Sequence, residues 1–207
     1  MIVAVDGPAA SGKGSIARAI AARFGLPHMD TGLLYRATAL NLLETGGDPE
    51  SEFAAARATD ISQIRFDDPE LKSETVGGLA SRISAYPLVR EALLERQRRF
   101  ATQAGGAVLD GRDIGTVIAP DAEVKLFVTA RTRIRAERRF AELKRAGLDV
   151  HLPDVLADIR ARDERESARA AAPLVMADDA ILLDTSDMNL EQAIGAAIGA
   201  VEARRAS

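Results

Sequence analysis

The chain has 207 residues, 47% of them hydrophobic and 28% charged, so it can bury the core of one globular domain, with or without insertions. Its formal net charge of −4 argues against a general nucleic-acid binder, and the absence of cysteine excludes disulfides, thiolate nucleophiles and cysteine-based metal sites. No apolar run approaches the ~18 residues of a membrane span and no signal peptide is visible, so we expect a cytoplasmic protein without membrane or nucleic-acid partners, and a monomer.

A short strand followed by a glycine-bounded loop opens the chain. Residues 1–6, MIVAVD, are apolar and rich in β-branched side chains, which indicates a buried parallel strand. Apolar residues recur at helical spacing from Lys13 to Phe24, and Gly25 ends that helix. The loop between them is similar to the phosphate-binding motif G-x-x-x-x-G-K-[ST]. The residues expected to surround the phosphates are Gly7, Pro8, Ala9, Ala10, Ser11, Gly12, Lys13, Gly14 and Ser15.

The hydroxyl of this motif comes one place late, because Gly14 stands where serine or threonine is usual and Ser15 follows it. One step along a helix turns a side chain by about 100°, so Ser15 can reach a phosphate oxygen but is poorly aimed at a metal. Since Mg²⁺ readily keeps several waters, we expect it near Ser15 and Asp110, held mainly through phosphates and water without a direct protein ligand.

The later elements alternate between strands and helices, which predicts a parallel α/β sheet. The expected strands are 26–30, 106–113, 122–130 and 180–186. One expected helix begins after a cap at Asp30 or Thr31, and three more cover 87–101, 132–146 and 153–169. A last, C-terminal helix is expected to be capped by Asn189. Around the turn at 67–70 we expect a small hairpin formed by 61–66 and 71–76.

Three polar stretches are candidates for a second substrate site. Tyr35 and Arg36 follow a helix start, and DGRDIGT (110–116) ends a core strand, where open α/β sheets bind ligands. In the third stretch Arg162, Glu166 and Arg169 share one helix face, with Arg165 beside it. A salt-bridged surface helix is the ordinary interpretation of such a run, and it applies equally to Arg131, Arg133, Arg135, Arg138 and Arg139.

Together these arginines would surround several phosphates, as phosphoryl transfer requires. A phosphate acceptor is already anionic and needs no general base, which agrees with two histidines, His28 and His151, that stand apart from every motif. The sequence argues against a switch GTPase, because no lysine of the chain follows Asn or Thr as guanine recognition by [NT]-K-x-D requires.

The motifs together resemble those of bacterial cytidylate kinases, in the nucleoside monophosphate kinase superfamily. The stretches that carry the resemblance are VDGPAASGKGS, DTGLLYR, YPLVREALLERQRRFA, DGRDIGTV and RDERESARAAAPL, which together extend over nearly the whole chain. The resemblance implies an α/β fold: a P-loop, NMP-kinase-like core with a five-stranded parallel sheet, an inserted NMP-binding region and a short helical lid. As a single kinase unit, the core would cover about 1–45, 106–144 and 171–207, the insertion 46–105 and the lid 145–170.

The same resemblance implies transfer of the γ-phosphoryl group of ATP to CMP or dCMP, with Mg²⁺. Residues 7–15 would bind ATP, and the catalytic set would be Lys13, Asp110, Arg162, Arg165 and Arg169. The CMP-binding set would be Thr31, Tyr35, Arg36, Ser81, Arg90, Arg112, Asp113, Arg162 and Glu166. Thr31 and Glu166 depart from the family's pattern, which has Ser and Asp there, and residues 62–80 are shorter than its usual insertion.

Two other functions stay open at this point. A related P-loop small-molecule kinase would act on UMP, AMP, shikimate or dephospho-coenzyme A. A regulator that binds nucleotide without transferring phosphate would be a protein of another class, although the presence of Lys13, Asp110 and the lid arginines argues against it.

Overall fold

The computed structural model describes residues 1–169 and 172–206. The chain divides into two compact units, a sheet unit (Met1–Met29 and Ala101–Ser207) and a helical unit (Asp30–Phe100). The boundary expected between lid and core, at residues 170 and 171, lies outside the described residues, as do those two positions of the RDERESARAAAPL stretch.

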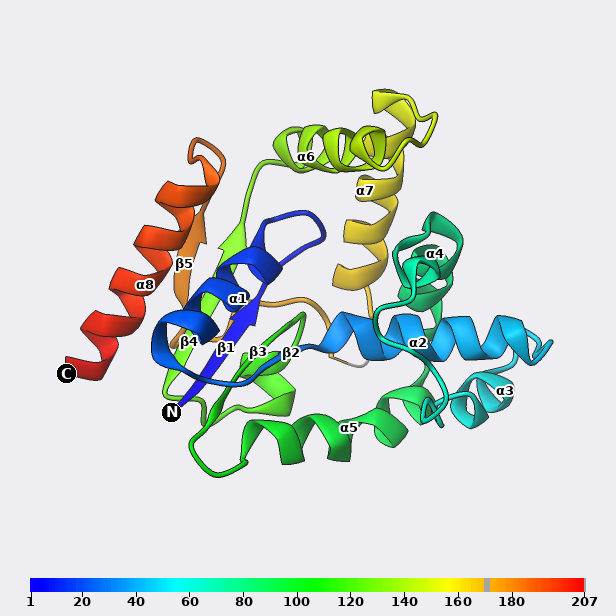
Figure 1. The fold of residues 1–207 in the computed structure, drawn as a ribbon, viewed down its shortest axis with the longest axis horizontal. Coiled ribbons are helices and arrows are strands. Elements are labelled where there is room, and N and C mark those ends of the chain that lie inside the picture. Colours follow the sequence, from blue (N-terminus) through cyan, green and yellow to red (C-terminus); the bar gives the residue numbers. More distant parts are fainter. Residues whose placement is uncertain (170–171, 207) are drawn as a thin grey trace. The chain divides into compact units, whose positions relative to one another are not determined.

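A five-stranded sheet forms the centre of the sheet unit (Figure 1). Its strands, in the order β2-β3-β1-β4-β5, are β2 (His28–Asp30), β3 (Ala107–Gly111), β1 (Ile2–Asp6), β4 (Val124–Thr129) and β5 (Ile181–Asp184). β1 pairs in parallel with β3 and β4, and β4 pairs in parallel with β5. All five strands lie within the predicted ranges, so the predicted parallel α/β sheet is confirmed.

The register brings the carboxyl ends of the central strands together. Asp6 is opposite Gly111 of β3 and Phe127 of β4, and Val5 is opposite Asp110. The loop after β1 and the segment after β3 therefore begin at the same edge of the sheet, which is where open α/β sheets bind ligands.

Two helices cover one face of this sheet, α1 (Lys13–Phe24) and α8 (Leu190–Ala206), which lie side by side in Figure 1. Ile16 and Ile20 of α1 and Ala197 of α8 are fully buried against Val5 and Leu126 of the strands. The predicted cap of α8 is confirmed, because Asn189 Oδ1 accepts the Gln192 N–H at 2.8 Å while Gln192 Oε1 accepts the Asn189 N–H at 2.9 Å.

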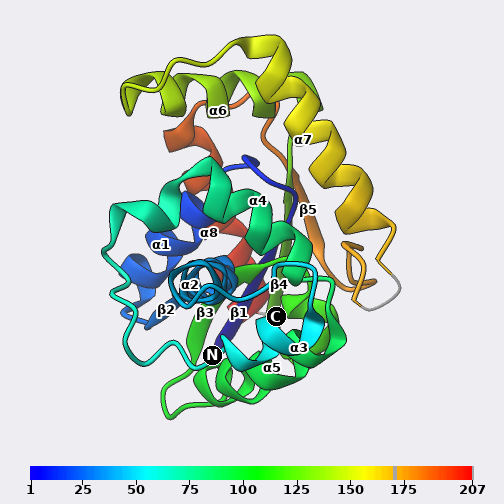
Figure 2. The same ribbon diagram turned by 90° about the vertical axis from the view of Figure 1, so that its right-hand side faces the viewer.

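A pair of packed helices, α6 (Thr132–Arg145) and α7 (Leu152–Ser167), completes the sheet unit (Figure 2). Between β3 and β4 the chain makes one short π-helical turn, η2 (Ile114–Ile118), which the sequence did not indicate. Its bonds run back five residues, from the Ile118 N–H to Asp113 O and from the Ala119 N–H to Ile114 O.

The helical unit is built around α2 (Thr31–Glu44), which contacts α3 (Glu52–Arg57), η1 (Pro69–Lys72) and α4 (Glu74–Ile83). The last long helix, α5 (Pro87–Ala101), covers the predicted range. Asp30, one of the two residues expected there, occupies the N-cap position of α2, although its side chain makes no capping hydrogen bond. Across the described ranges, each helix is too short or too polar to span a bilayer.

The hairpin predicted for 61–76 is wrong. Asp68 caps a 3₁₀ turn that has Pro69 in its first turn, and Ser73 then caps α4 by accepting the Val76 N–H at 3.2 Å. Capping side chains and a proline favour the start of a helix over strand pairing, and this local chemistry outweighs the alternation of apolar residues.

We predict that Ser73→Ala lowers the free energy of unfolding by about 1 kcal/mol, because one N–H at the start of α4 loses its acceptor. Urea denaturation of the purified variant measures this change. Ser62→Ala is the matched control, since Ser62 is exposed and outside any helix, and it should stay within about 0.5 kcal/mol of wild type. Equal effects of the two substitutions would contradict the capping role.

Candidate active site

The loop between β1 and α1 approaches the sheet too closely for any side chain at its first glycine. Gly7 has φ 153°, and a Cβ added there would lie 2.0 Å from the carbonyl oxygen of Val128 in β4. Gly12, at φ 93°, turns the chain into α1, whose first N–H groups point back into the loop. Within the described residues, the Ser11 hydroxyl is buried without a hydrogen-bond partner. A glycine-bounded loop with an unsatisfied buried hydroxyl at a helix N-terminus is suited to bind phosphate oxygens.

Lys13 brings the one mobile positive charge of this loop close to the carboxylates at the sheet edge. Its Nζ donates to Pro8 O at 3.4 Å. The ammonium charge also lowers the pKa values of Asp6 and Glu166, although it is a smaller influence on both than burial. Lys13 is therefore placed among anionic groups at the end of the phosphate loop.

Two arginines of α6 hold the carbonyl groups of the phosphate loop. Arg135 Nη1 donates to Ala9 O at 3.2 Å, and Arg138 Nη1 donates to Ser11 O at 3.4 Å. The hydroxyl of Thr185 adds a second donor to Ser11 O at 3.2 Å. The predicted surface position is thus wrong for Arg135, which is ion-paired with Asp163 but only 4% exposed. Arg138 is half-buried and donates to the hydroxyl and carbonyl oxygens of Thr185. Burial of one face of α6 against the loop is the cause, and a charge pattern alone cannot report it.

The structure also corrects the view of His28 as a histidine apart from every motif. His28 Nε2 lies 2.7 Å from Asp110 Oδ1, and both side chains are largely buried. The other carboxylate oxygen of Asp110 faces the start of α1, since a Cβ on Gly14 would lie 3.6 Å from it. Asp110 is thus held beside the phosphate loop by a residue 82 positions away, and no local sequence signal marks that pair.

Asp6 was not among the predicted site residues, yet it organises the segment that follows β3. Its carboxylate accepts the Ile114 and Gly115 N–H groups, each at 2.8 Å, directly after Arg112 and Asp113. Burial raises the pKa of Asp6 to about 6, assisted by the charge of Asp113 and opposed by the two N–H donors. A charged residue that ends a buried strand is the signal that could have identified it.

The acceptor-side groups of the sheet unit form an ion-pair cluster. Arg112 Nε donates to Glu166 Oε2 at 2.6 Å, and Glu166 is buried. Burial alone would raise the pKa of Glu166, but the charges of Arg112, Lys13 and Arg169 together hold it below its usual value. The structure therefore brings together Lys13, Arg112, Glu166 and Arg169, four of the residues assigned by the resemblance.

The two remaining lid arginines differ in their surroundings. Arg162 is buried, with its Nε 2.8 Å from Asp158 Oδ2 in an ion pair one turn earlier on α7. Arg165 is exposed on the same helix. A solvent-facing arginine can move to a ligand, whereas Arg162 is held in place by its own helix.

In the helical unit, Arg36 lies across α4. Its Nη1 donates to Leu71 O at 2.6 Å, and a Cβ on Gly77 would lie 2.9 Å from its Nη2. Arg90 Nη1 donates to Ser84 O at 3.3 Å, and Ser81 O accepts the Ser84 hydroxyl at 2.9 Å. Thr31 is buried and Tyr35 half-buried, at the start of α2.

A metal would depend on the nucleotide for most of its ligands. Among the described residues, no group of three or more His, Cys, Asp or Glu side chains is arranged to hold a metal ion. Arg18 Nη2 donates a hydrogen bond to Ser15 Oγ at 3.3 Å, and Asp110 lies beside Gly14. One hydroxyl and one carboxylate oxygen next to a phosphate loop fit Mg²⁺, which retains water and binds phosphate oxygens.

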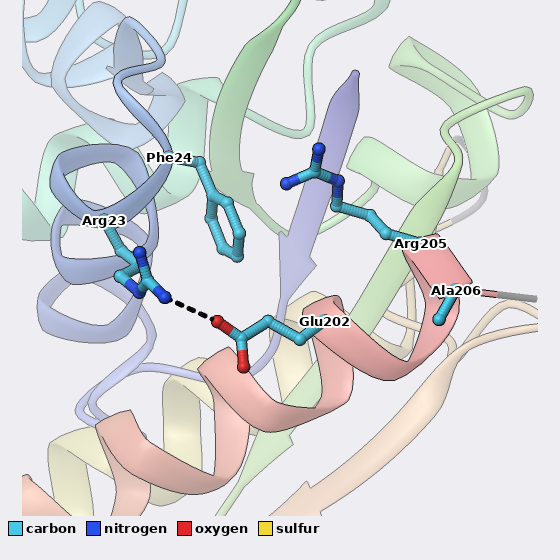
Figure 3. A pocket seen from close by; sticks show the side chains of 5 residues that line it. All are labelled: Arg23, Phe24, Glu202, Arg205 and Ala206. Atoms are coloured by element: carbon cyan, nitrogen blue, oxygen red, sulfur yellow. Dashed lines mark hydrogen bonds and ion pairs between the residues drawn. The ribbon is translucent and has the colours of Figure 1, made fainter.

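A cavity of about 460 Å³ lies at the other end of α1 and is lined by Arg23, Phe24, Glu202, Arg205 and Ala206 (Figure 3). Arg23 pairs with Glu202 at 2.9 Å, and the Arg205 guanidinium lies 5.4 Å from the Phe24 ring centre. A twelve-residue helix separates this cavity from the phosphate loop by about 18 Å, so it plays no part in the site described above.

The strand, loop and helix at the N-terminus, with lysine and arginines around the loop, define a P-loop protein. The chain matches the family described as cytidylate kinase over residues 3–203. A cytidylate kinase from Xanthobacter autotrophicus is 58% identical, over 100% of this chain and 99% of the relative. Another from Methylocella silvestris is 55% identical, over 98% and 94%. The chain therefore belongs to the cytidylate kinase family.

One solved structure is similar in fold alone. An uncharacterized protein from Eubacterium ventriosum ATCC 27560 aligns with a TM-score of 0.57 and 14% identity, over 98% of both chains. At that identity the likeness supports the chain path and carries no information about a substrate.

We predict a pH-dependent stability difference between wild type and Asp6→Asn. Because burial raises the pKa of Asp6 from 3.8 to about 6, the folded state takes up a proton that the unfolded state does not, between about pH 6 and pH 4. The stabilisation that proton uptake by Asp6 gives the folded state therefore increases as pH falls and is lost as pH rises through 6. Between pH 7 and pH 4.5, the free energy of unfolding of wild type should rise by about 2 kcal/mol relative to that of Asp6→Asn. Urea denaturation of both proteins at each pH measures this change.

Asp121→Asn is the control for this measurement, because Asp121 is exposed beyond η2. Its difference from wild type should be nearly constant over the same pH range. A constant difference for Asp6→Asn as well would show that the carboxylate titrates near its ordinary pKa.

Proposed function

We propose that the protein transfers the γ-phosphoryl group of ATP to CMP or dCMP, giving ADP and CDP or dCDP. The observation that carries this proposal is the phosphate loop with Lys13 beside it, in a chain that belongs to the cytidylate kinase family. The enzyme is accordingly a phosphotransferase of the kinase type, with ATP as its co-substrate.

In this proposal the loop residues 7–15 bind the phosphates of ATP, largely through backbone N–H groups and the helix N-terminus. Lys13 neutralises charge on the phosphates, while Arg162, Arg165 and Arg169 surround the transferring group. Phosphoryl transfer proceeds with little covalent participation by the protein, so positioning and charge account for most of the acceleration. No general base is required, because the attacking phosphate oxygen of CMP is already ionised.

Mg²⁺ would be held by the nucleotide phosphates and by water near Ser15 and Asp110, and when bound it would neutralise phosphate charge. The contribution of the chain itself is orientation. The pair between His28 and Asp110 fixes one carboxylate oxygen and leaves the other directed toward Gly14.

For the acceptor we propose Arg36 and Arg112 as phosphate ligands, and Ser81, Arg90 and Asp113 as readers of cytosine. Thr31 and Tyr35 would line the same site, and Arg162 and Glu166 would contact the sugar. The support within the sheet unit is the 2.6 Å bond between Arg112 and Glu166, which holds a guanidinium ready for an anionic ligand. Kinases for UMP, AMP or shikimate, and a binding protein without transferase activity, are not favoured by any specific observation.

We predict that kcat/KM for CMP is on the order of 10²-fold higher than kcat/KM for UMP. Initial rates with CMP, dCMP, UMP and AMP identify the acceptor. Cytosine has a donor at N4 and an acceptor at N3, whereas uracil reverses both, so UMP would leave buried polar groups unpaired. Asp113→Ala should therefore reduce the rate with CMP far more than the rate with UMP.

Asp121→Ala, an exposed aspartate in the same region, should leave both rates unchanged. Equal losses for CMP and UMP in Asp113→Ala would remove Asp113 from the base pocket, and faster turnover of AMP than of CMP would refute the proposed acceptor.

A pair of adjacent glycines in α4 allows a second test. A Cβ on Gly77 would displace the Arg36 guanidinium, whereas a Cβ on Gly78 meets no atom within 4 Å. We predict that Gly77→Ala raises the KM for CMP about tenfold, the equivalent of one charge-assisted hydrogen bond, without changing the KM for ATP. Gly78→Ala should stabilise α4 by up to about 1 kcal/mol. Gly77→Ala also disturbs the bond from Arg36 to Leu71 O, so the melting temperature of each variant and the unchanged KM for ATP distinguish a local loss from unfolding. An unchanged KM in Gly77→Ala would contradict the role of Arg36.

A further inference from the structure

One buried side chain of the sheet unit joins the phosphate loop to α7. Every N–H of the Arg135 guanidinium has an acceptor. Nε donates to Ala130 O at 2.8 Å, and Nη2 donates to Thr132 Oγ1 at 3.0 Å. Nη1 donates to Ala9 O at 3.2 Å, and the two Nη atoms donate to both carboxylate oxygens of Asp163, at 2.9 and 2.6 Å. This saturated fork connects three segments that are far apart in the sequence.

The loop end of this connection is a peptide whose orientation matters for phosphate binding. Ala10 has φ 58°, an unfavourable conformation for a residue with a Cβ, so the loop needs outside support at this point. A trans peptide plane directs its C=O and N–H to opposite sides. Arg135 fixes the Ala9 carbonyl group and thereby fixes where the Ala10 N–H points, and such loop N–H groups are the ones that bind phosphate.

The same loop residue is also packed against both helices. The Ala9 methyl lies in one apolar cluster with Ala136 and Leu143 of α6 and with Val155 and Ile159 of α7. A shift of α7 would therefore alter both the packing of Ala9 and the acceptor that holds Arg135.

At the other end, Asp163 lies on α7 between residues assigned to the transferring phosphates and the sugar. Arg162 precedes it, and Glu166, which accepts Arg112 at 2.6 Å, follows three places later. The bidentate pair allows only a narrow range of positions for α7 relative to α6.

We propose that Arg135 is a positioning residue that couples α7 to the phosphate loop. When α7 is docked through Asp163, Arg135 holds the Ala9–Ala10 peptide in its phosphate-binding orientation, and nucleotide binding in turn favours the docked helix. This inference rests on the proposed function, because it requires that the loop binds the phosphates of ATP.

The test is a double-mutant cycle on the Kd for ATP, measured by calorimetry with Mg²⁺ present. Asp163→Asn and Arg135→Lys should each weaken binding about tenfold, because neither retains the bidentate pair. The double variant should be no weaker than the worse single variant, since both substitutions break one connection. The matched controls are Glu164→Gln and Arg133→Lys, at exposed neighbouring positions on the same two helices, and both should keep the wild-type Kd.

A second readout separates coupling from simple support of the fold. In wild type, adding ADP should slow hydrogen exchange of the α7 amides, and in Asp163→Asn this slowing should be lost while exchange in β1 and β4 stays unchanged. A purely structural role would lower the melting temperature but keep the ADP-dependent protection. If Arg135→Lys does not fold, Asp163→Asn decides alone by both readouts.

Three results have distinct meanings. Wild type that does not bind ATP would refute the proposed function, and this inference with it. Wild type that binds ATP while folded Asp163→Asn keeps its Kd would overturn the coupling alone. A double variant whose fold-increase in Kd for ATP equals the product of the two single increases would also overturn the coupling, because it would show two independent effects.

Discussion

The two hydrogen bonds that Asp6 accepts set the geometry on which the candidate site depends. Asp6 ends β1 and immediately precedes the phosphate loop, and its oxygens hold the N–H groups of Ile114 and Gly115 at 2.8 Å. The segment that carries Arg112 and Asp113 is thereby fixed to the strand that carries the loop. A serine or an asparagine could not accept both N–H groups with two equivalent anionic oxygens. Burial raises the pKa of Asp6 to about 6, because the loss of hydration destabilises the carboxylate by more than the two hydrogen bonds stabilise it.

The phosphate loop is held from several sides, and each contact acts on backbone. Gly7 lies against the carbonyl of Val128, Arg138 and Thr185 donate to Ser11 O, and Arg135 donates to Ala9 O. Because these partners take carbonyl groups, the loop N–H groups stay directed to the other side of their peptide planes. A loop that is rigid before the ligand arrives loses less conformational entropy on binding.

Most of the sheet unit could be predicted from the sequence, because its signals are local. The apolar run before Gly7, Gly25 after α1, and the capping pair Asn189 and Gln192 each act within a few residues. The hairpin prediction is wrong although its signals are also local, since the capping side chains of Asp68 and Ser73 favour helix starts over strand pairing. The phosphate loop, Arg112 and Glu166 were predicted as site residues by motif. His28, Asp6 and Arg135 were not, because the role of each arises from partners 82, 108 and 126 positions away, and one sequence does not report such contacts.

The composition contains a related ambiguity that only the contacts resolve. With 23 arginines against four lysines, a general codon preference explains much of the total. Some arginines are solvated, such as Arg133, whose side chain is 82% exposed. Arg135 and Arg138 differ, because they place several N–H donors on carbonyl, hydroxyl and carboxylate oxygens at once. A lysine offers three donors on one atom and cannot connect acceptors in separate segments. The choice of arginine over lysine therefore has little consequence at the exposed surface of α6. On the face of α6 that meets the loop, arginine is a structural requirement.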